Sequence, residues 1–115
     1  MPPRDPRLRV DDILTAIDRI ESYTTGMTYD AFAADQKTID AVVRNFEVMG
    51  EAARHVDEQL AQRAPDVPWN DIRDMRNILI HGYFGVDVAT VWKTILDDLP
   101  SLKGALRSLI EAREP

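Results

Sequence analysis

The residues best suited to chemistry lie close together in one segment, residues 73–83, which reads Arg-Asp-Met-Arg-Asn-Ile-Leu-Ile-His-Gly-Tyr. Histidine titrates near neutral pH and can accept or donate a proton, whereas arginine offers a planar, permanently charged fork to a phosphate. This pair suits cleavage of an RNA phosphodiester, in which the 2′-hydroxyl supplies the nucleophile and no metal is required. Arg76 and His81 are therefore the candidate catalytic residues. Asn77 and Arg73 are candidate supporting residues, and Asn77 could orient the imidazole or bind the sugar-phosphate.

The spacing of the candidate pair bears on how both residues could reach one phosphate. On an ideal helix that turns about 100° per residue, Arg76 and His81 point about 140° apart and do not touch. Either the helix loosens at His81, or two copies pair so that each site takes groups from both chains. Ile80 falls within the polar sector formed by the candidate residues, and an apolar residue there is easier to explain if a second subunit covers it. We therefore favour a homodimer.

Residue types alone leave a simpler interpretation open for these side chains. A histidine and an arginine near a helix end usually cap its carbonyls and carry surface charge. The other histidine, His55, follows a long helical pattern beside Arg54, and we interpret it as a surface or capping residue. Glu51 could pair with Arg73 or Arg76 across the bundle, or it could simply be solvated.

The composition limits the class of protein. The chain of 115 residues fits one domain, 1–115, and with no cysteine and two histidines it lacks the residues for disulfides, thiolate metal sites or a histidine-rich metal centre. A net charge of −6 argues against a general nucleic-acid coat, so any contact with RNA must be small and focused. No apolar run is long enough for a membrane span, and the first residues do not resemble a signal peptide. We expect a cytoplasmic protein without a metal or cofactor.

Apolar residues recur with helical spacing along most of the chain, and no segment shows strand-like alternation. Residues 1–8 hold three prolines and are predicted to be a flexible lead-in. A first helix follows and ends near Gly26, a short helical turn is predicted at 28–32, and a second long helix is predicted over about 35–56. Gly50 lies inside that second helix, where a small residue suggests close approach of another helix or chain.

The second half of the chain continues the helical pattern. A short helix is predicted within 57–68, ahead of a loop marked by two prolines, and Trp69 opens a third long helix that should end at the candidate histidine. Asp87 is the predicted N-cap of a last helical run, which Pro100 breaks or kinks. Trp69 and Trp92 occupy apolar-stripe positions, which favours core packing over base stacking. The predicted fold class is all-α, an antiparallel up-and-down bundle of four main helices plus short helical pieces.

The candidate segment and its flanks resemble a known family. Arg76, four residues, His81, one residue and Tyr83 resemble the signature of HEPN ribonucleases, and the polar Asn77 after the arginine also fits. Residues 40–52 and 67–87 look like the HepT-like branch of that superfamily. The resemblance covers about residues 10 to 110, and the flanking stretches make it far more specific than the short motif alone.

The resemblance implies a fold, an activity and a partner. The HEPN fold is an up-and-down helical bundle that dimerises with its two motifs facing each other. The implied activity is metal-independent endoribonucleolytic cleavage of transfer or messenger RNA by the toxin of a type VII-like toxin–antitoxin system. The implied antitoxin is an MntA-like nucleotidyltransferase that moves AMP from ATP to the motif tyrosine, here Tyr83. Adenylate beside Arg76 and His81 would block the site and repel an RNA phosphate.

A second function remains open at this point. The acidic overall charge is poor for RNA binding, and it would suit a non-catalytic helical adaptor that binds a nucleotide or a partner. In that case Tyr83 could be a plain packed tyrosine. Growth arrest on expression of the protein alone would favour the toxin. A purely structural helical dimer would leave the polar sector around Arg76 unexplained.

Overall fold

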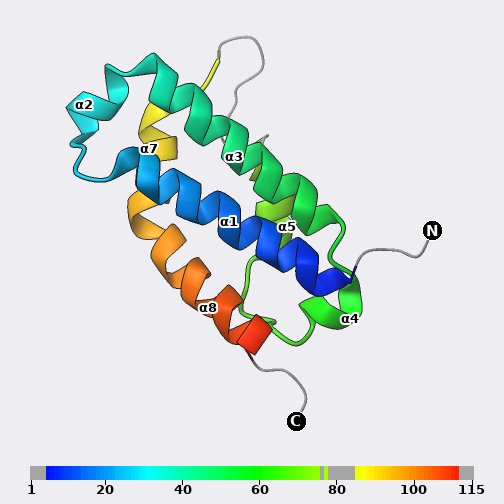
Figure 1. The fold of residues 1–115 in the computed structure, drawn as a ribbon. Coiled ribbons are helices and arrows are strands. Elements are labelled where there is room, and N and C mark those ends of the chain that lie inside the picture. The colour runs from blue at the N-terminus through cyan, green and yellow to red at the C-terminus, as the bar shows by residue number, and fades with distance from the viewer. Residues whose placement is uncertain (1–4, 76, 78–84, 112–115) are drawn as a thin grey trace.

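The computed structural model describes residues 5–75, 77 and 85–111, and in these residues it consists of α-helices and connections without a β-strand (Figure 1). The all-α class predicted from the sequence is confirmed. The described helices are, in chain order, α1 (Pro6–Thr24), α2 (Tyr29–Ala33), α3 (Gln36–Arg54), α4 (Glu58–Ala61), α5 (Trp69–Arg73), α7 (Val88–Asp97) and α8 (Leu99–Glu111).

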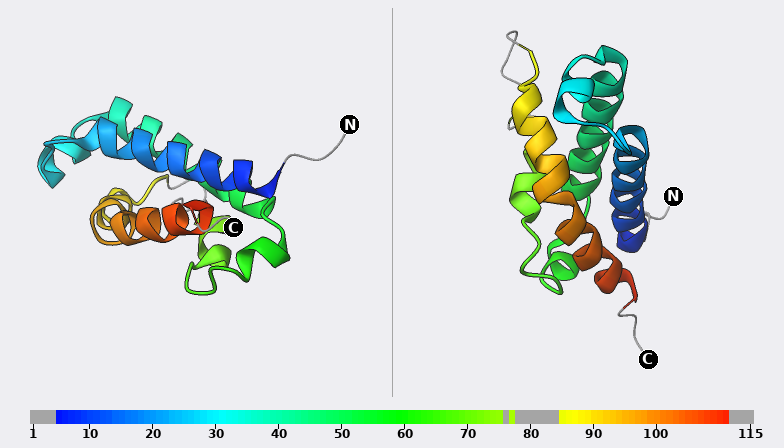
Figure 2. Two further views of the ribbon diagram at one scale, coloured as in Figure 1. Left: turned by 60° about the horizontal axis from the view of Figure 1, so that its bottom comes forward. Right: turned by 90° about the vertical axis from the view of Figure 1, so that its left-hand side faces the viewer.

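The helices form a two-layered bundle (Figure 2). In one layer α1 and α3 run antiparallel and side by side, and in the other α7 and α8 follow one another along the molecule. α8 packs against α1, and α5 packs against α3. The short helix α2 contacts both α3 and α7 and so joins the two layers at one end. This is the antiparallel arrangement that the sequence predicts.

Side-chain caps fix where several helices begin. The first N–H groups of a helix have no partner within it, and an oxygen of the preceding residue can accept one of their hydrogen bonds. In the protein this oxygen belongs to Asp5 for α1, Thr28 for α2, Asp35 for α3, Asp57 for α4 and Asp87 for α7. The predicted cap at Asp87 is thus confirmed. At Asp35 the backbone N–H and the hydroxyl of Thr38 both donate to the carboxylate, and they lower its pKa.

The predicted lead-in over residues 1–8 is too long, because α1 already begins at Pro6. Proline suits the first position of a helix, where its fixed φ fits and its missing N–H would have had no partner. Asp5 completes the start by accepting a hydrogen bond of 2.9 Å from the N–H of Arg7. Here a proline marks the beginning of a helix and not the end of a flexible tail.

The predicted apolar stripes form the core. They bury side chains of all the long helices, namely Val10, Ile13, Ile17 and Ile20 of α1, Ile39, Val42, Phe46 and Met49 of α3, and Leu99, Leu102, Leu106 and Leu109 of α8. Both tryptophans pack as predicted. The ring of Trp92 lies 5.0 Å from that of Phe32, and the indole N–H of Trp69 donates to the carbonyls of Ala61 and Ala64.

The helix end predicted at Gly26 and the helix break predicted at Pro100 are also confirmed. α1 ends at Thr24, two residues before Gly26, whose φ of 76° is readily adopted only by glycine. α7 ends at Asp97 and α8 begins at Leu99, so the last helical run is divided beside Pro100. Proline has no N–H to continue the hydrogen-bond ladder of the preceding turn, which explains the break.

Gly50 allows α5 to approach α3 closely. A Cβ atom at position 50 would lie 3.0 Å from the carbonyl oxygen of Ile72 and 3.6 Å from that of Arg73. These oxygens belong to the last residues of α5, so a side chain at position 50 would crowd the backbone of α5 and require it to shift by a few tenths of an ångström. The close approach predicted for Gly50 is confirmed, and the approaching element is the helix that leads into the candidate segment.

We expect Gly50→Ala to destabilise the fold and Gly104→Ala to stabilise it. Both glycines lie inside helices, where alanine is favoured by about 0.5–1 kcal/mol, and a Cβ at Gly104 would meet nothing within 4 Å. At Gly50 crowding against backbone should outweigh that gain and leave a net loss of about 1–2 kcal/mol. Urea unfolding of both variants measures the difference. Equal stabilisation by both substitutions would contradict the close approach.

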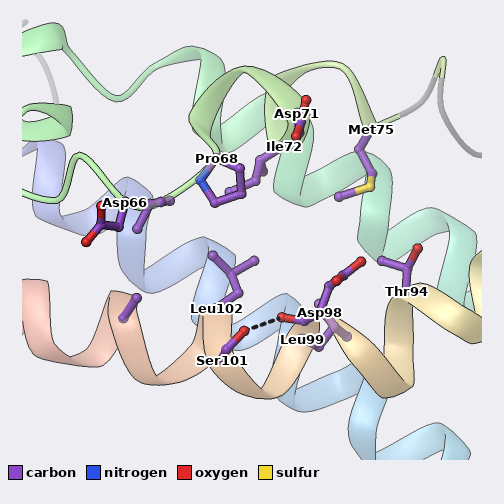
Figure 3. Close-up of a pocket in the computed structure, with 12 residues that line it drawn as sticks. Asp66, Pro68, Asp71, Ile72, Met75, Thr94, Asp98, Leu99, Ser101 and Leu102 are labelled. Carbon is purple, nitrogen blue, oxygen red and sulfur yellow. Dashed lines mark hydrogen bonds between the residues drawn. The ribbon is translucent and has the colours of Figure 1, made fainter.

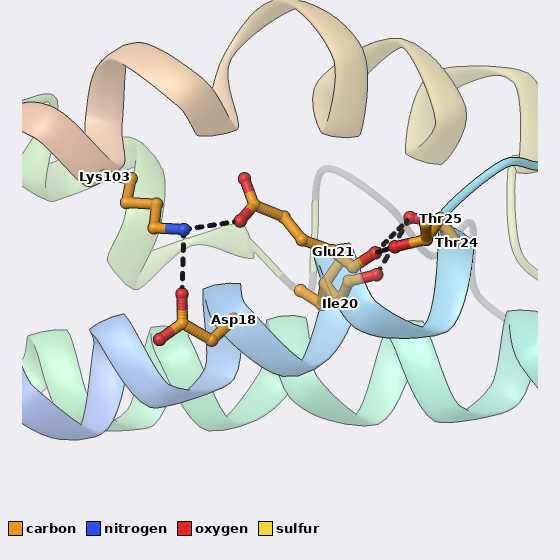
Figure 4. Close-up of polar contacts among 6 residues, drawn as sticks. All are labelled: Asp18, Ile20, Glu21, Thr24, Thr25 and Lys103. Atoms are coloured by element: carbon orange, nitrogen blue, oxygen red, sulfur yellow. Dashed lines mark hydrogen bonds and ion pairs between the residues drawn. The ribbon is translucent and has the colours of Figure 1, made fainter.

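Lys103 ties α8 to α1 through two carboxylates (Figure 4). Its Nζ lies 2.7 Å from Glu21 Oε1 and 2.9 Å from Asp18 Oδ1. The hydrogen bonds to Glu21 and Asp18 stabilise the ammonium form, and they raise the pKa of Lys103 above its ordinary value of 10.5. The hydroxyls of Thr24 and Thr25 bind carbonyls of the same last turn of α1.

The stabilising effect of Lys103 should be lost at alkaline pH. Because the folded pKa is the higher one, the effect is complete below pH 10.5 and disappears as the pH rises through the raised value. Lys103→Gln should therefore lower the free energy of unfolding at neutral pH, and by less once the pH exceeds the raised pKa. Lys93→Gln removes an exposed lysine of α7 as the control. A stability difference that is the same at both pH values would contradict this role.

Candidate active site

The structure describes part of the candidate segment. Arg76, His81 and Tyr83 lie outside the described residues, so their predicted roles stay predictions. Asn77 and Arg73, the two supporting candidates, are described, together with the helices that carry them.

The sequence predicts one continuous third helix from Trp69 to the candidate histidine. In the structure this helix is interrupted. α5 ends at Arg73, and Asp74 leaves the helical conformation with φ −99° and ψ 14°. Met75 and Asn77 are helical again. The predicted continuous helix is therefore wrong at Asp74, and the angles of an ideal helix do not carry from Arg73 to the residues beyond. A one-dimensional apolar pattern missed the break because Ile72 and Met75 are both buried on either side of it.

Asp74 and Asn77 hold this break together. The backbone N–H of Asn77 donates to the carbonyl of Asp74 at 2.9 Å, and its Nδ2 donates to Asp74 Oδ1 at 2.6 Å. Asn77 is exposed, and its amide oxygen has no donor among the described residues, which is compatible with its predicted part beside the imidazole.

Arg73 binds the end of α3. Its Nε donates to the carbonyl of Ala53 at 3.0 Å and its Nη2 to that of Val56 at 3.3 Å, while Nη1 reaches Asn70 Oδ1 at 3.1 Å. The last carbonyls of a helix have no partner within it and carry partial negative charge, so a guanidinium there is stabilising. The structure gives Arg73 a positioning task, and a contact of its guanidinium with a phosphate stays a prediction.

A polar hollow of about 370 Å³ lies beside Asn77, between the outer face of α3 and the end of α5. It is lined by Arg44, Glu47, Gly50, Glu51, Arg54, Arg73 and Asn77, and we call it the arginine hollow. Arg44 and Arg54 are not among the site residues predicted from the sequence. The sequence pattern that could have indicated them is a row of four charged residues on the polar face of the second helix, at positions 44, 47, 51 and 54.

The remaining candidates on α3 take surface roles. Glu51 Oε2 lies 3.2 Å from His55 Nε2, and both side chains are more than half exposed. His55 is the C-cap residue of α3, which confirms its interpretation as a surface or capping histidine. Of the alternatives for Glu51, the structure does not support pairing with Arg73, which binds backbone carbonyls and Asn70. Pairing with Arg76 lies outside the described residues.

A second hollow, of about 600 Å³, lies on the opposite side of α5, where it faces α7 and α8 (Figure 3). Its lining includes the apolar side chains of Ile72, Met75, Leu99 and Leu102. The charged residues of the described lining are three exposed aspartates, Asp66, Asp71 and Asp98, with no lysine or arginine. We call this the acidic hollow, and it differs from the arginine hollow in the sign of its charge.

Metal ligands do not cluster in the part of the chain that the structure describes. Its residues hold no group of three or more histidine, aspartate or glutamate side chains arranged to bind a metal ion. Among the described helices, none is both long and apolar enough to cross a bilayer.

Comparison with known proteins identifies the family. A family model described as "Ribonuclease HepT-like" matches residues 13–109. The chain belongs to the HepT-like ribonuclease family. "Probable ribonuclease HepT" of Thermococcus cleftensis is 42% identical over 100 residues, which make up 87% of this chain and 91% of that protein. No solved structure gave a significant match.

Further relatives match over similar lengths. Two proteins of Methanocaldococcus jannaschii, each named "Putative RNase", are 38% and 36% identical to this chain. The first alignment covers 88% of this chain and 84% of the relative, and the second covers 99% and 98%. This HepT-like chain therefore covers 84–98% of the length of these three relatives. The family match includes α3, α5 and the candidate segment 73–83.

We expect Arg73→Met to lower stability more than Arg107→Met. Removal of the guanidinium leaves carbonyls at the end of α3 without their charged donor, which should cost about 1–3 kcal/mol. Arg107 is exposed on α8 and lines neither hollow, so it controls for the loss of one positive charge. Chemical denaturation measures both variants. If Arg73→Met unfolds like wild type, its main role lies elsewhere than at the end of α3.

Proposed function

We propose that this protein is a metal-independent endoribonuclease and the toxin of a type VII-like toxin–antitoxin pair, with Arg76 and His81 as its catalytic residues. The observation that carries the proposal is the family match over residues 13–109, which contains Arg76, His81 and Tyr83 at the spacing of the HEPN signature. Relatives named as ribonucleases, at 36–42% identity, support the same activity.

The proposed reaction uses the nucleophile that RNA itself carries. The 2′-hydroxyl attacks the adjacent phosphorus, the bond to the 5′-oxygen of the next nucleotide breaks, and a 2′,3′-cyclic phosphate remains. His81 moves the proton, since imidazole is both a base and an acid near neutral pH. Arg76 neutralises the charge that develops on the non-bridging oxygens. Asn77 orients the imidazole or binds the sugar-phosphate.

The described structure supports this proposal by fixing the start of the catalytic segment. Gly50 lets α5 lie directly against α3, and Arg73 binds α3 carbonyls from the last residue of α5. Asp74 and Asn77 then form a hydrogen-bonded turn next to Arg76. The described residues on both sides of Arg76 are thus held by α3 and by this turn, and the proposal is that they position the catalytic segment at the reacting phosphate.

The proposal extends to assembly and regulation. The active form is a homodimer, in which each site takes groups from both chains, in the cytoplasm. A cognate MntA-like nucleotidyltransferase silences it by transfer of AMP to Tyr83, because bulk and negative charge beside Arg76 and His81 exclude an RNA phosphate. The substrate class is transfer or messenger RNA.

The adaptor function remains the second candidate, and two observations favour it. The net charge is −6, and the acidic hollow under α5 carries three aspartates without a basic residue in its described lining. An adaptor of this kind would cleave no RNA. At the acidic hollow it would bind a basic partner protein, because the three aspartates repel the phosphates of a nucleotide.

We expect His81→Ala to abolish RNA cleavage in EDTA and His55→Ala to leave it intact. Loss of a general acid–base group lowers the rate by about 100-fold or more. His55 is the matched control because it is the other histidine of the chain and lies exposed at the end of α3. Purified wild type and both variants are compared on one RNA, and their dimers are checked by light scattering.

The outcomes of this assay separate the two functions. Cleavage by all three proteins would identify a contaminating nuclease and contradict the assignment of His81. Absence of cleavage by wild type of unmodified mass would favour the adaptor. If mass spectrometry found AMP on Tyr83 in inactive wild type, the inactivity would instead support a silenced toxin.

A further inference from the structure

The outer face of α3 presents two arginines whose guanidinium groups are available to a ligand. Arg44 is exposed, and it makes no hydrogen bond or ion pair in the part of the chain that the structure describes. Arg54 is also exposed, and its Nε donates to the carbonyl of Arg73 at 3.3 Å. Its two terminal nitrogens have no partner among the described residues. Both side chains line the arginine hollow together with Asn77.

The geometry of α3 sets how far apart these two charges stand. Arg44 and Arg54 are ten residues apart, which corresponds to about 15 Å along the helix and about 80° around its axis. They therefore lie on one face of α3 but are too far apart to hold a single phosphate. An extended ligand with several negative charges could contact both.

The charge balance of the hollow favours an anion. Its lining contains three arginines and two glutamates, in a protein whose net charge is −6. Glu51 lies against His55, and Glu47 is also engaged in an interaction. Arg73 keeps its full positive charge while it binds the carbonyls of α3. The side of α5 that faces α3 is thus locally positive on an acidic molecule.

The other side of α5 excludes the same ligand. In the acidic hollow, Asp66, Asp71 and Asp98 would repel a phosphate chain, and no lysine or arginine among the described lining residues offsets them. The two sides of one short helix therefore differ in charge, and among the described surfaces beside α5 the outer face of α3 is the one that favours a polyanion.

We infer that Arg44 and Arg54 bind phosphates of the RNA strand on either side of the nucleotide that is cleaved, so that the strand runs along the outer face of α3. This inference rests on the proposed ribonuclease function and assigns a binding surface to it. The contacts are to the backbone and not to the bases, so they add affinity without sequence preference. They also concentrate RNA binding on a small part of an acidic protein.

The test compares Arg44→Gln, Arg54→Gln and the double variant with Arg19→Gln and Arg107→Gln. The last two remove the same charge from exposed residues of α1 and α8 that line neither hollow. Each single variant should raise KM by roughly 3- to 10-fold with kcat within about 2-fold of wild type. The slope of log KM against log salt should fall by about 0.7 for each phosphate that the variant no longer binds. The control variants should change neither quantity.

A binding measurement separates failure of this inference from failure of the proposed function. Fluorescein-labelled poly(U) is titrated into His81→Ala protein with and without the Arg44→Gln and Arg54→Gln substitutions. Weaker binding with a smaller salt slope in the substituted protein supports the arginine contacts, even if no RNA is cleaved. The proposed arginine contacts are overturned if this protein binds poly(U) as tightly as His81→Ala protein that carries Arg19→Gln or Arg107→Gln. Cleavage of RNA by wild type would then still support the ribonuclease. A raised KM that follows only from dissociation of the dimer, with an unchanged salt slope, also overturns the inference.

Discussion

The contact between the ends of α3 and α5 is the constraint on which the candidate site depends. α5 spans only Trp69–Arg73, and so short a helix is not stable in isolation. It is held because Gly50 admits its backbone closely and because Arg73 adds a charged donor to the carbonyls of Ala53 and Val56 at the end of α3 and just beyond it. Arg54 returns a hydrogen bond from α3 to the carbonyl of Arg73. The two helix ends therefore stabilise each other, and the candidate segment begins where they meet.

The distribution of charge follows from this contact. α5 separates the arginine hollow from the acidic hollow, and each takes its charge from the elements on its own side. In a protein of net charge −6, a general attraction for RNA is absent. A local positive face can still guide a phosphate chain, because electrostatic interactions are screened beyond roughly 8–10 Å at moderate salt. A small, focused RNA contact is thus physically compatible with an acidic chain.

Residues close to the boundary set the ends of most helices, and the end of α5 is the exception. α3, α7 and α8 begin and end close to the predicted positions, since their caps, glycine and proline act within a few residues of the boundary. α1 begins earlier than predicted because Asp5 and Pro6 together make a favourable first turn. The end of α5 has no such local signal. Its break at Asp74 accompanies the docking of Arg73 on α3, which lies about twenty residues away in the sequence.

The sequence by itself determined the helical class, the apolar stripes, the cap at Asp87 and the spacing of Arg76, His81 and Tyr83. These follow from residue type and from separations of a few residues. It also indicated the close approach at Gly50, but not which element approaches. Only the tertiary structure decided that Arg73 binds α3 carbonyls, that Arg44 and Arg54 share a hollow with Asn77, and that the two sides of α5 differ in charge. The physical reason is that these properties depend on which distant helix ends pack together, and a linear pattern of residues does not contain that information.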